Sequence, residues 1–221
     1  MEPAPQPPGE RRPLATRETR WARRMALCLA GRGVTPNAIS VGGMMAGILA
    51  GGVFYATSRW PEFARAGWIA GAALVQLRLL ANMLDGMVAM ETRTASPVGE
   101  LYNEIPDRIS DGATLIGFGY ALGSDPTHGY IAACLAFFVA YVRAMGKAAG
   151  ARHEFCGPMA KPHRMFAVTM GALYCGVAPA GWQPDPGVPV WVLALIIAGC
   201  LITAPRRLLR IGATLRGRTP A

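Results

Sequence analysis

The sequence predicts an all-α integral membrane protein with six transmembrane helices, preceded by a short amphipathic helix on the cytoplasmic side. Of its 221 residues, 52% are hydrophobic and 16% are charged, whereas soluble domains carry about 25% charged residues. The apolar residues also gather in blocks close to the ~20 residues that a membrane-crossing helix needs. We expect spans at roughly 36–57, 66–90, 108–124, 127–150, 163–181 and 188–206.

The net charge of +9 follows a topological pattern and does not indicate a nucleic-acid partner. Basic residues are frequent before the first block, in the connection near 150–164 and after the last block, but sparse in the alternate connections. This is the positive-inside pattern for an inner (cytoplasmic) membrane protein with both termini in the cytoplasm. Four tryptophans near the opposite ends of the spans are expected to form an outer aromatic belt: Trp60, Trp68, Trp182 and Trp191.

Two regions are predicted before the first span. Residues 1–13 are rich in proline and are expected to be disordered. Residues 14–32 are expected to form a juxtamembrane amphipathic helix. Its arginines suit either an anionic membrane surface or a simple positive-inside anchor, and the sequence leaves both interpretations open.

The transmembrane domain is predicted to cover residues 33–211 and to precede a basic tail at 212–221. Its first span begins at "GVTPNAIS", where Thr35 fits a helix N-cap and Pro36 the first helical position. Small residues let helices approach closely in lipid, and five glycines recur along this span: Gly42, Gly43, Gly47, Gly51 and Gly52.

Polar residues gather in the second and third blocks. Asn82 and Asp85 lie three residues apart and so share a helix face. Asn103, Asp107 and Asp111 recur at four-residue steps and share a face of the next helix. Helices joined by a short connection are expected to be antiparallel neighbours. The two polar faces are therefore predicted to meet near the cytoplasmic ends of both helices.

This cluster predicts a site for a hard cation such as Mg²⁺ or Mn²⁺. Carboxylates at membrane depth are costly and usually mark a functional site, and oxygen ligands suit these ions. The alternative without a functional role is a set of helix-end polar residues in an interfacial loop. The same predicted side carries cations that suit phosphate binding: Arg78, Arg143, Lys161 and Arg164.

The spacing of this cluster resembles the signature of the CDP-alcohol phosphotransferase family, D-x2-D-G-x2-A-R-x8-G-x3-D-x3-D. The register fits without a gap, with matches at Asp85, Gly86, Ala89, Gly99 and Asp107. Asn82 and Asn103 stand where the family has Asp, and Met90 stands where it has Arg. The stretches "TPNAIS", "SPVGELYNE", "YVRA" and "GPMAKPHR" are also similar to family stretches, so the resemblance covers about 33–210.

The resemblance implies a membrane-bound homodimeric enzyme that transfers a phosphatidyl group from CDP-diacylglycerol to a small alcohol and releases CMP. It implies one or two divalent ions, with Asp107 as the base and Gly86, Ala89 and Gly99 beside the nucleotide. Arg93 is a candidate for the cation missing at Met90. Asp111 lies outside the signature but shares the helix face of Asp107, so it is added to the candidate metal ligands. These are Asn82, Asp85, Asn103, Asp107 and Asp111.

The two asparagines distinguish this chain from the family pattern. Fewer ligand charges weaken metal binding, so we expect either lower affinity or a single ion, with Asp111 or Glu104 supplying part of the missing charge. Two alternative functions stay open: a catalytically impaired member that binds CDP-lipid, and a small transporter. The sequence does not identify the acceptor, although Lys161 and Arg164 slightly favour one that carries phosphate.

Overall fold

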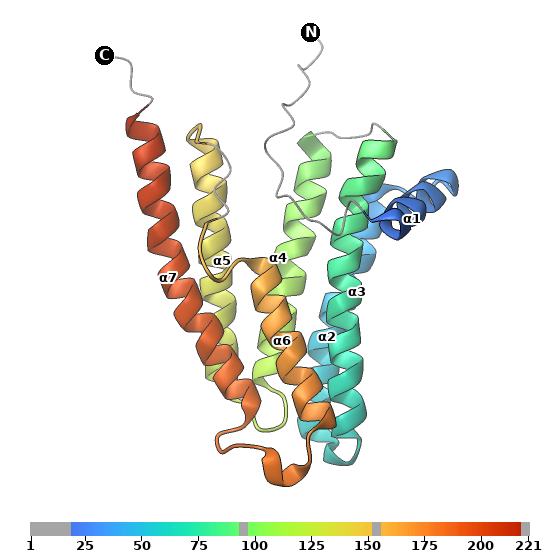
Figure 1. Cartoon of the computed structure of the whole chain (residues 1–221), viewed down its shortest axis with the longest axis vertical. Coiled ribbons are helices and arrows are strands. Elements are labelled where there is room, and N and C mark those ends of the chain that lie inside the picture. The colour runs from blue at the N-terminus through green and yellow to red at the C-terminus, as the bar shows by residue number, and fades with distance from the viewer. Residues whose placement is uncertain (1–18, 93–96, 152–155, 218–221) are drawn as a thin grey trace.

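The computed structural model describes residues 19–92, 97–151 and 156–217, and every regular element in these ranges is a helix. Helices α2 to α7 run along one common axis, and α1 lies across one end of them (Figure 1). The helices are α1 (Arg20–Gly31), α2 (Pro36–Arg59), α3 (Ala64–Glu91), α4 (Pro97–Gly119), α5 (Pro126–Ala148), α6 (Lys161–Val177) and α7 (Val188–Arg216).

The described residues include four helical segments long and apolar enough to cross a membrane: Pro36–Arg59, Pro61–Glu91, Pro126–Ala148 and Val188–Arg216. This supports a multi-pass membrane protein. The remaining long helices, α4 and α6, lie within the same bundle (Figure 1). The predicted start of the third span was wrong, because α4 begins at Pro97 and not near 108. Its polar residues share one face, so the helix can include them.

Local sequence explains where two of the long helices begin. Pro36 occupies the first position of α2, and the Thr35 side chain accepts a hydrogen bond from the Ala38 amide at 3.2 Å, as predicted. Helix α5 begins in the same way at Pro126, where the Asp125 carboxylate accepts from the Thr127 amide at 2.6 Å. That hydrogen bond lowers the pKa of Asp125, because it favours the charged form.

Helix α2 forms the central contact between α3 and α4. It packs extensively against both, whereas α3 and α4 have few contacts with each other. A Cβ atom on Gly47 would lie 2.5 Å from the Ser110 Cβ atom, and one on Gly51 would overlap the Ala113 carbonyl oxygen. The prediction of close approach is confirmed for these two glycines, which bring α4 directly against α2. It is wrong for Gly42 and Gly52, which have no such neighbour within 4 Å.

An aromatic core lies well away from the polar cluster. Phe54 contacts Trp68 and Phe118, with ring centroids 5.7 Å and 5.1 Å apart. Phe54 is about 21 Å further along α2 than Ser40, at the ~1.5 Å rise per residue of an α-helix. The polar residues described below therefore occupy the opposite half of the bundle from this core.

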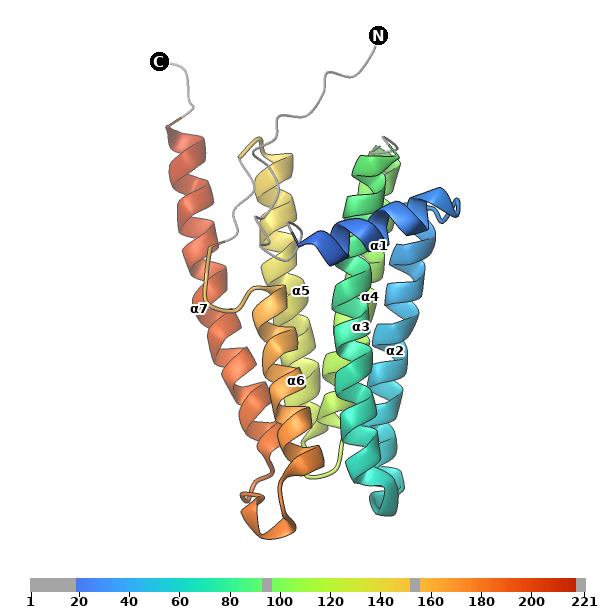
Figure 2. The same cartoon turned by 45° about the vertical axis from the view of Figure 1, so that its right-hand side comes forward.

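Helix α1 is amphipathic, as predicted, over Arg20–Gly31. It crosses α3 near the end of the bundle at which α3 finishes (Figure 2). Ala22 and Ala26 are buried in one cluster with Leu84 and Val88 of α3, while its arginines are exposed. The predicted disordered segment 1–13 and the end of the basic tail lie outside the described residues.

Candidate active site

The structure brings the predicted polar faces of α3 and α4 together. With its amide turned to satisfy the surrounding hydrogen bonds, Asn82 donates to Asp107 Oδ1 at 2.9 Å and to Asn103 Oδ1 at 3.1 Å. These contacts join α3 to α4 although the two helices pack mainly against α2. The side chains therefore meet across a space between the helices rather than in a tight helix–helix seam.

Asp85 lies beside this group and is held by the first long helix. Its side chain is buried, with 4% of the residue exposed. Oδ2 accepts a hydrogen bond from Ser40 Oγ at 2.7 Å, whereas Oδ1 is buried without a hydrogen-bond partner among the described residues. A buried carboxylate oxygen without a partner is unfavourable unless a cation or donor reaches it. Oδ1 is thus the strongest local indication of a bound cation.

Cations from two other segments hold Asp107. Arg78 Nη2 lies 2.7 Å from Asp107 Oδ1, and the Lys161 ammonium forms an ion pair with Oδ2. Arg78 is one helical turn before Asn82 on α3, and Lys161 is the first residue of α6. Both oxygens of Asp107 therefore have a positively charged neighbour.

Asp111 lies one helical turn deeper and is completely buried between two arginines. Its Oδ1 is 3.2 Å from Arg78 Nη2, and its Oδ2 is 3.3 Å from Arg164 Nη2. Arg164 also donates to the Met159 carbonyl oxygen at 3.0 Å. Arg78 Nε in turn donates to Ser110 Oγ at 2.8 Å. Asp111 thus fixes two buried guanidinium groups behind Asp107.

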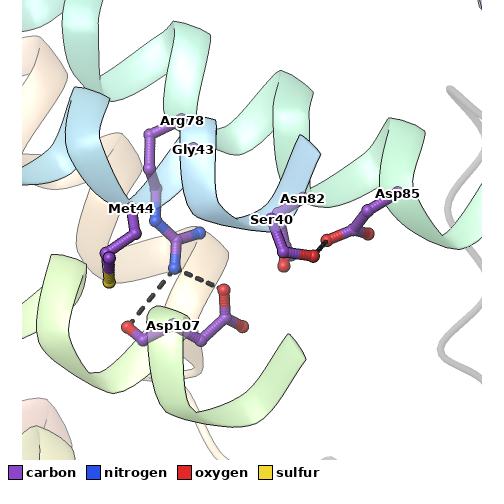
Figure 3. A pocket seen from close by; sticks show the side chains of 7 residues that line it. All are labelled: Ser40, Gly43, Met44, Arg78, Asn82, Asp85 and Asp107. Atoms are coloured by element: carbon purple, nitrogen blue, oxygen red, sulfur yellow. Dashed lines mark hydrogen bonds and ion pairs between the residues drawn. The ribbon is translucent and has the colours of Figure 1, made fainter. Parts of the chain in front are cut away.

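A small cavity separates Asp85 from Asp107 (Figure 3). Its volume of about 10 Å³ is close to the space that one water molecule requires. The figure shows Asp85 directed toward Ser40, and the Arg78 guanidinium between α3 and Asp107. The lining residues are Ser40, Gly43, Met44, Arg78, Asn82, Asp85 and Asp107.

The donor set fits one hard cation. Oxygen atoms of Asp85 and Asp107, with the nearby amide oxygen of Asn103, are ligands that Mg²⁺ and Mn²⁺ accept. Among the described residues, no group of three or more His, Cys, Asp or Glu side chains is placed to hold a metal. The site therefore offers a small mixed set of carboxylate and amide oxygens.

The other predicted residues lie around this centre. Arg143 of α5 forms an ion pair with Glu104, which also pairs with Arg108 at 2.6 Å. Met90 is 61% exposed. Gly86, Ala89 and Gly99 are half-buried, and their role beside a nucleotide stays a prediction. Arg93 lies outside the described residues.

Sequence reasoning missed Ser40 and Ser110. Ser40 lies within the stretch "TPNAIS", which indicated it only as part of a helix start. Ser110 follows Asp107 by three residues and therefore shares its face. Small hydroxyl residues in membrane helices also serve packing, so neither could be assigned to the site without the contacts that the structure gives.

Comparison with known proteins places these observations in a family context. The profile of the CDP-alcohol phosphatidyltransferase family matches residues 33–204. A phosphatidylinositol phosphate synthase of Mycobacterium tuberculosis (strain H37Rv) is 29% identical over 182 residues, which cover 80% of this chain and 78% of that protein. An archaetidylinositol phosphate synthase of Pyrococcus horikoshii is 26% identical over 158 residues, covering 70% and 77%.

Solved structures show the same fold. The crystal structure of the Mycobacterium tuberculosis phosphatidylinositol phosphate synthase with CDP-DAG bound matches with a TM-score of 0.72 and 24% identity, over 92% of this chain and 99% of that one. The same enzyme in complex with manganese and citrate matches with a TM-score of 0.73 and 23% identity, over 90% and 93%.

Proposed function

The chain belongs to the CDP-alcohol phosphatidyltransferase family, and from that premise we propose that it transfers a phosphatidyl group from CDP-diacylglycerol to a small alcohol that carries phosphate. CMP is the other product, and the reaction belongs to phospholipid biosynthesis. The observation that carries the proposal is the cavity between Asp85 and Asp107, because it lies within the family's spaced signature and is lined by groups that suit phosphoryl transfer.

Asp107 is the proposed base. The acceptor hydroxyl must lose a proton as its oxygen attacks the phosphorus atom, and a carboxylate within hydrogen-bond reach can accept that proton. Asp107 lines the cavity and is partly exposed, unlike Asp111. Its contacts with Arg78, Lys161 and Asn82 fix the direction of its oxygens. Asp111, held between arginines, is proposed to position the site from behind.

Mg²⁺ or Mn²⁺ is the cofactor, and we propose that Asp85 is the carboxylate that would hold it. A divalent ion bound there would supply positive charge to the diphosphate and to the departing CMP. Asp85 presents its unpartnered Oδ1 for this purpose. Ser40 keeps the other oxygen of Asp85 fixed through its hydrogen bond.

Basic residues around the cavity support a phosphate-bearing acceptor. Arg78 Nη1 is buried without a hydrogen-bond partner among the described residues. Its two N–H groups can therefore still donate to an anion. Lys161 and Arg143 are partly exposed on neighbouring helices. Because the relatives are named as inositol phosphate lipid synthases, inositol phosphate is the first acceptor to test.

The proposed membrane arrangement has six spans, with α4 and α6 completing the four apolar helices. Helix α1 and the C-terminal end of α7 lie at the end of the bundle to which α3 leads (Figure 1). The distribution of arginine supports a cytoplasmic position for that end, by the positive-inside rule. The donor then reaches the site from the lipid and the acceptor from the cytoplasm. A homodimer in the cytoplasmic membrane is part of this proposal and follows from the family resemblance.

One alternative has a specific observation in its favour. Arg78 and Lys161 already pair with Asp107, and amides replace two carboxylates of the family signature. A protein that binds CDP-lipid without turning it over would be compatible with these contacts. The retained Asp85 and Asp107, with space between them, favour the active enzyme.

The test is CMP release by the purified full-length protein with CDP-diacylglycerol and Mg²⁺. Acceptors are supplied in matched pairs with and without phosphate: inositol phosphate and inositol, glycerol phosphate and glycerol, phosphoserine and serine. We expect CMP release together with a new phospholipid, and only with a phosphorylated member of a pair. CMP release with the plain alcohols alone would exclude the proposed acceptor class. Absence of release with every acceptor would favour the binding protein.

A further inference from the structure

We propose that the site holds one divalent cation per chain, ligated through Asp85, and that the side chains of Arg78 and Lys161 take the place of a second cation beside Asp107. The inference rests on the proposed function only in assuming that a metal is used. It concerns how this chain distributes positive charge around the cavity, and three sets of contacts carry it.

The first set occupies Asp107. One oxygen faces the Arg78 guanidinium at 2.7 Å and the other pairs with the Lys161 ammonium. A second divalent ion ligated by this carboxylate would have to displace one of these cations or lie next to it. Like charges at such separations repel strongly away from bulk water, so the ion pairs oppose a metal on the Asp107 side.

The second set holds Arg78 in place. Arg78 is only 2% exposed, and its Nε donates a hydrogen bond to Ser110 Oγ at 2.8 Å. Its Nη2 lies 3.3 Å from the Asp107 carbonyl oxygen and 3.2 Å from Asp111 Oδ1. These contacts reach a hydroxyl, a carbonyl and two carboxylates, so moving the guanidinium aside would leave several buried polar groups without partners. Arg78 is therefore a fixed cation of the site.

The third set involves the two asparagines. Asn82 donates its amide hydrogens to Asp107 Oδ1 and to Asn103 Oδ1. An N–H group cannot coordinate a metal, and here it also occupies oxygens that would otherwise face one. A carboxylate at position 82 could not make these hydrogen bonds. The asparagine thus lets α3 and α4 meet without a metal between them.

The Asp85 carboxylate remains as a strong metal ligand. Asp85 Oδ1 is buried and without a hydrogen-bond partner among the described residues. The cavity next to it has room for about one water-sized particle. Arg78 lines the same cavity, and its unpartnered Nη1 can donate to a phosphate oxygen. The diphosphate would then be bound between a single metal on the Asp85 side and two protein cations on the Asp107 side.

The experiment counts bound Mn²⁺ by equilibrium dialysis and by electron paramagnetic resonance, on purified full-length protein with CDP present. We expect one Mn²⁺ per chain in the wild type. Asp85→Asn should weaken binding at least about tenfold, whereas the matched substitution Asp185→Asn, on an exposed loop at the far end, should leave the count at one. The triple variant Arg78→Gln, Asn82→Asp, Asn103→Asp should bind two.

Two Mn²⁺ per wild-type chain would overturn the inference, as would an ion that persists unchanged in Asp85→Asn. These two measurements do not depend on the triple variant, whose buried substitution at Arg78 can prevent folding. CMP release is recorded on the same preparation. Two ions with CMP release contradict the inference and leave the proposed function standing, while no ion together with no CMP release contradicts both.

Discussion

Asn82 is the residue at which this chain departs most informatively from its family. An aspartate at this position would bring a second carboxylate to within about a hydrogen-bond distance of Asp107, and such pairs need a cation or a shared proton between them. The amide instead donates to Asp107 Oδ1 and Asn103 Oδ1. At the scale of single residues, the site is therefore built to be stable with less metal than a set of four aspartates would require.

Replacing Asn82 by Asp should make folding depend on metal. We expect Asn82→Asp to lower the Tm in EDTA, because the new carboxylate faces Asp107. Adding Mg²⁺ should then raise the Tm of this variant by more than it raises the Tm of the wild type. Thermal unfolding in detergent, with and without Mg²⁺, measures both effects. Gln183→Glu adds the same charge near the far end of the bundle and serves as control. An Mg²⁺ dependence identical to that of the wild type would contradict this role of Asn82.

At the scale of helices, the contact between α2 and α4 positions the site. Gly47 and Gly51 allow α4 to lie against α2, and this contact sets the depth of Ser110 and Asp107. Thr114 Oγ1 adds a hydrogen bond to the Gly47 carbonyl oxygen at 3.1 Å. The two helices that carry the signature are thus aligned through a third helix.

Neighbouring glycines of α2 provide a matched test of this contact. Gly51→Ala should destabilise the protein by about 1–3 kcal/mol, the usual range for forcing an extra carbon into a packed interface, because its Cβ would overlap the Ala113 carbonyl oxygen. Gly52→Ala should have almost no effect, since its Cβ would have no such neighbour within 4 Å. Unfolding in a denaturing detergent series measures the difference. Equal stability of the two variants would argue against the contact.

The start of α2 and the register of the signature could be predicted from the sequence because they depend on local patterns. Pro36 and Thr35 mark a helix start, and the spacing of Asn82, Asp85, Asn103 and Asp107 places them on facing sides of two helices. The start of α4 was mispredicted because hydropathy alone does not distinguish a polar helix face from a loop.

Contacts between distant segments were not predictable in this way. The pairing of Arg78 and Lys161 with Asp107, and of Ser40 with Asp85, depends on how α2, α3, α4 and α6 are rotated about their axes. Hydrophobic periodicity fixes such rotations only coarsely in a membrane helix, whose lipid-facing side is also apolar. The charge balance of the site therefore required the structure.

At the scale of the whole molecule, the bundle separates a polar end from an aromatic end. Asp85 lies in the last two turns of α3, and this end of α3 lies at the same end of the bundle as α1 and the C-terminal end of α7 (Figure 1). The turn Ala180–Trp182 lies at the other end. This polarity matches the direction in which a cytoplasmic acceptor and a lipid donor would approach.

Cysteine labelling in intact cells tests that orientation. Trp182 is 70% exposed on the turn at the far end, so Trp182→Cys should react with a membrane-impermeant maleimide added outside the inner membrane. The wild type is the control and should stay unlabelled, because exposed Cys28 lies on α1 at the proposed cytoplasmic end and exposed Cys134 lies within the apolar helix Pro126–Ala148. Labelling of the wild type at Cys28 with none at position 182 would show the opposite orientation.

The most direct test of the account is the effect of Asp107→Asn on CMP release from CDP-diacylglycerol at saturating Mg²⁺ and acceptor. If Asp107 accepts the proton of the acceptor hydroxyl, the rate should fall by about 10²- to 10⁴-fold, the usual contribution of a general base, while Asp185→Asn keeps the wild-type rate. Equal CMP release by Asp107→Asn and the wild type would contradict the claim that this cavity is the catalytic centre.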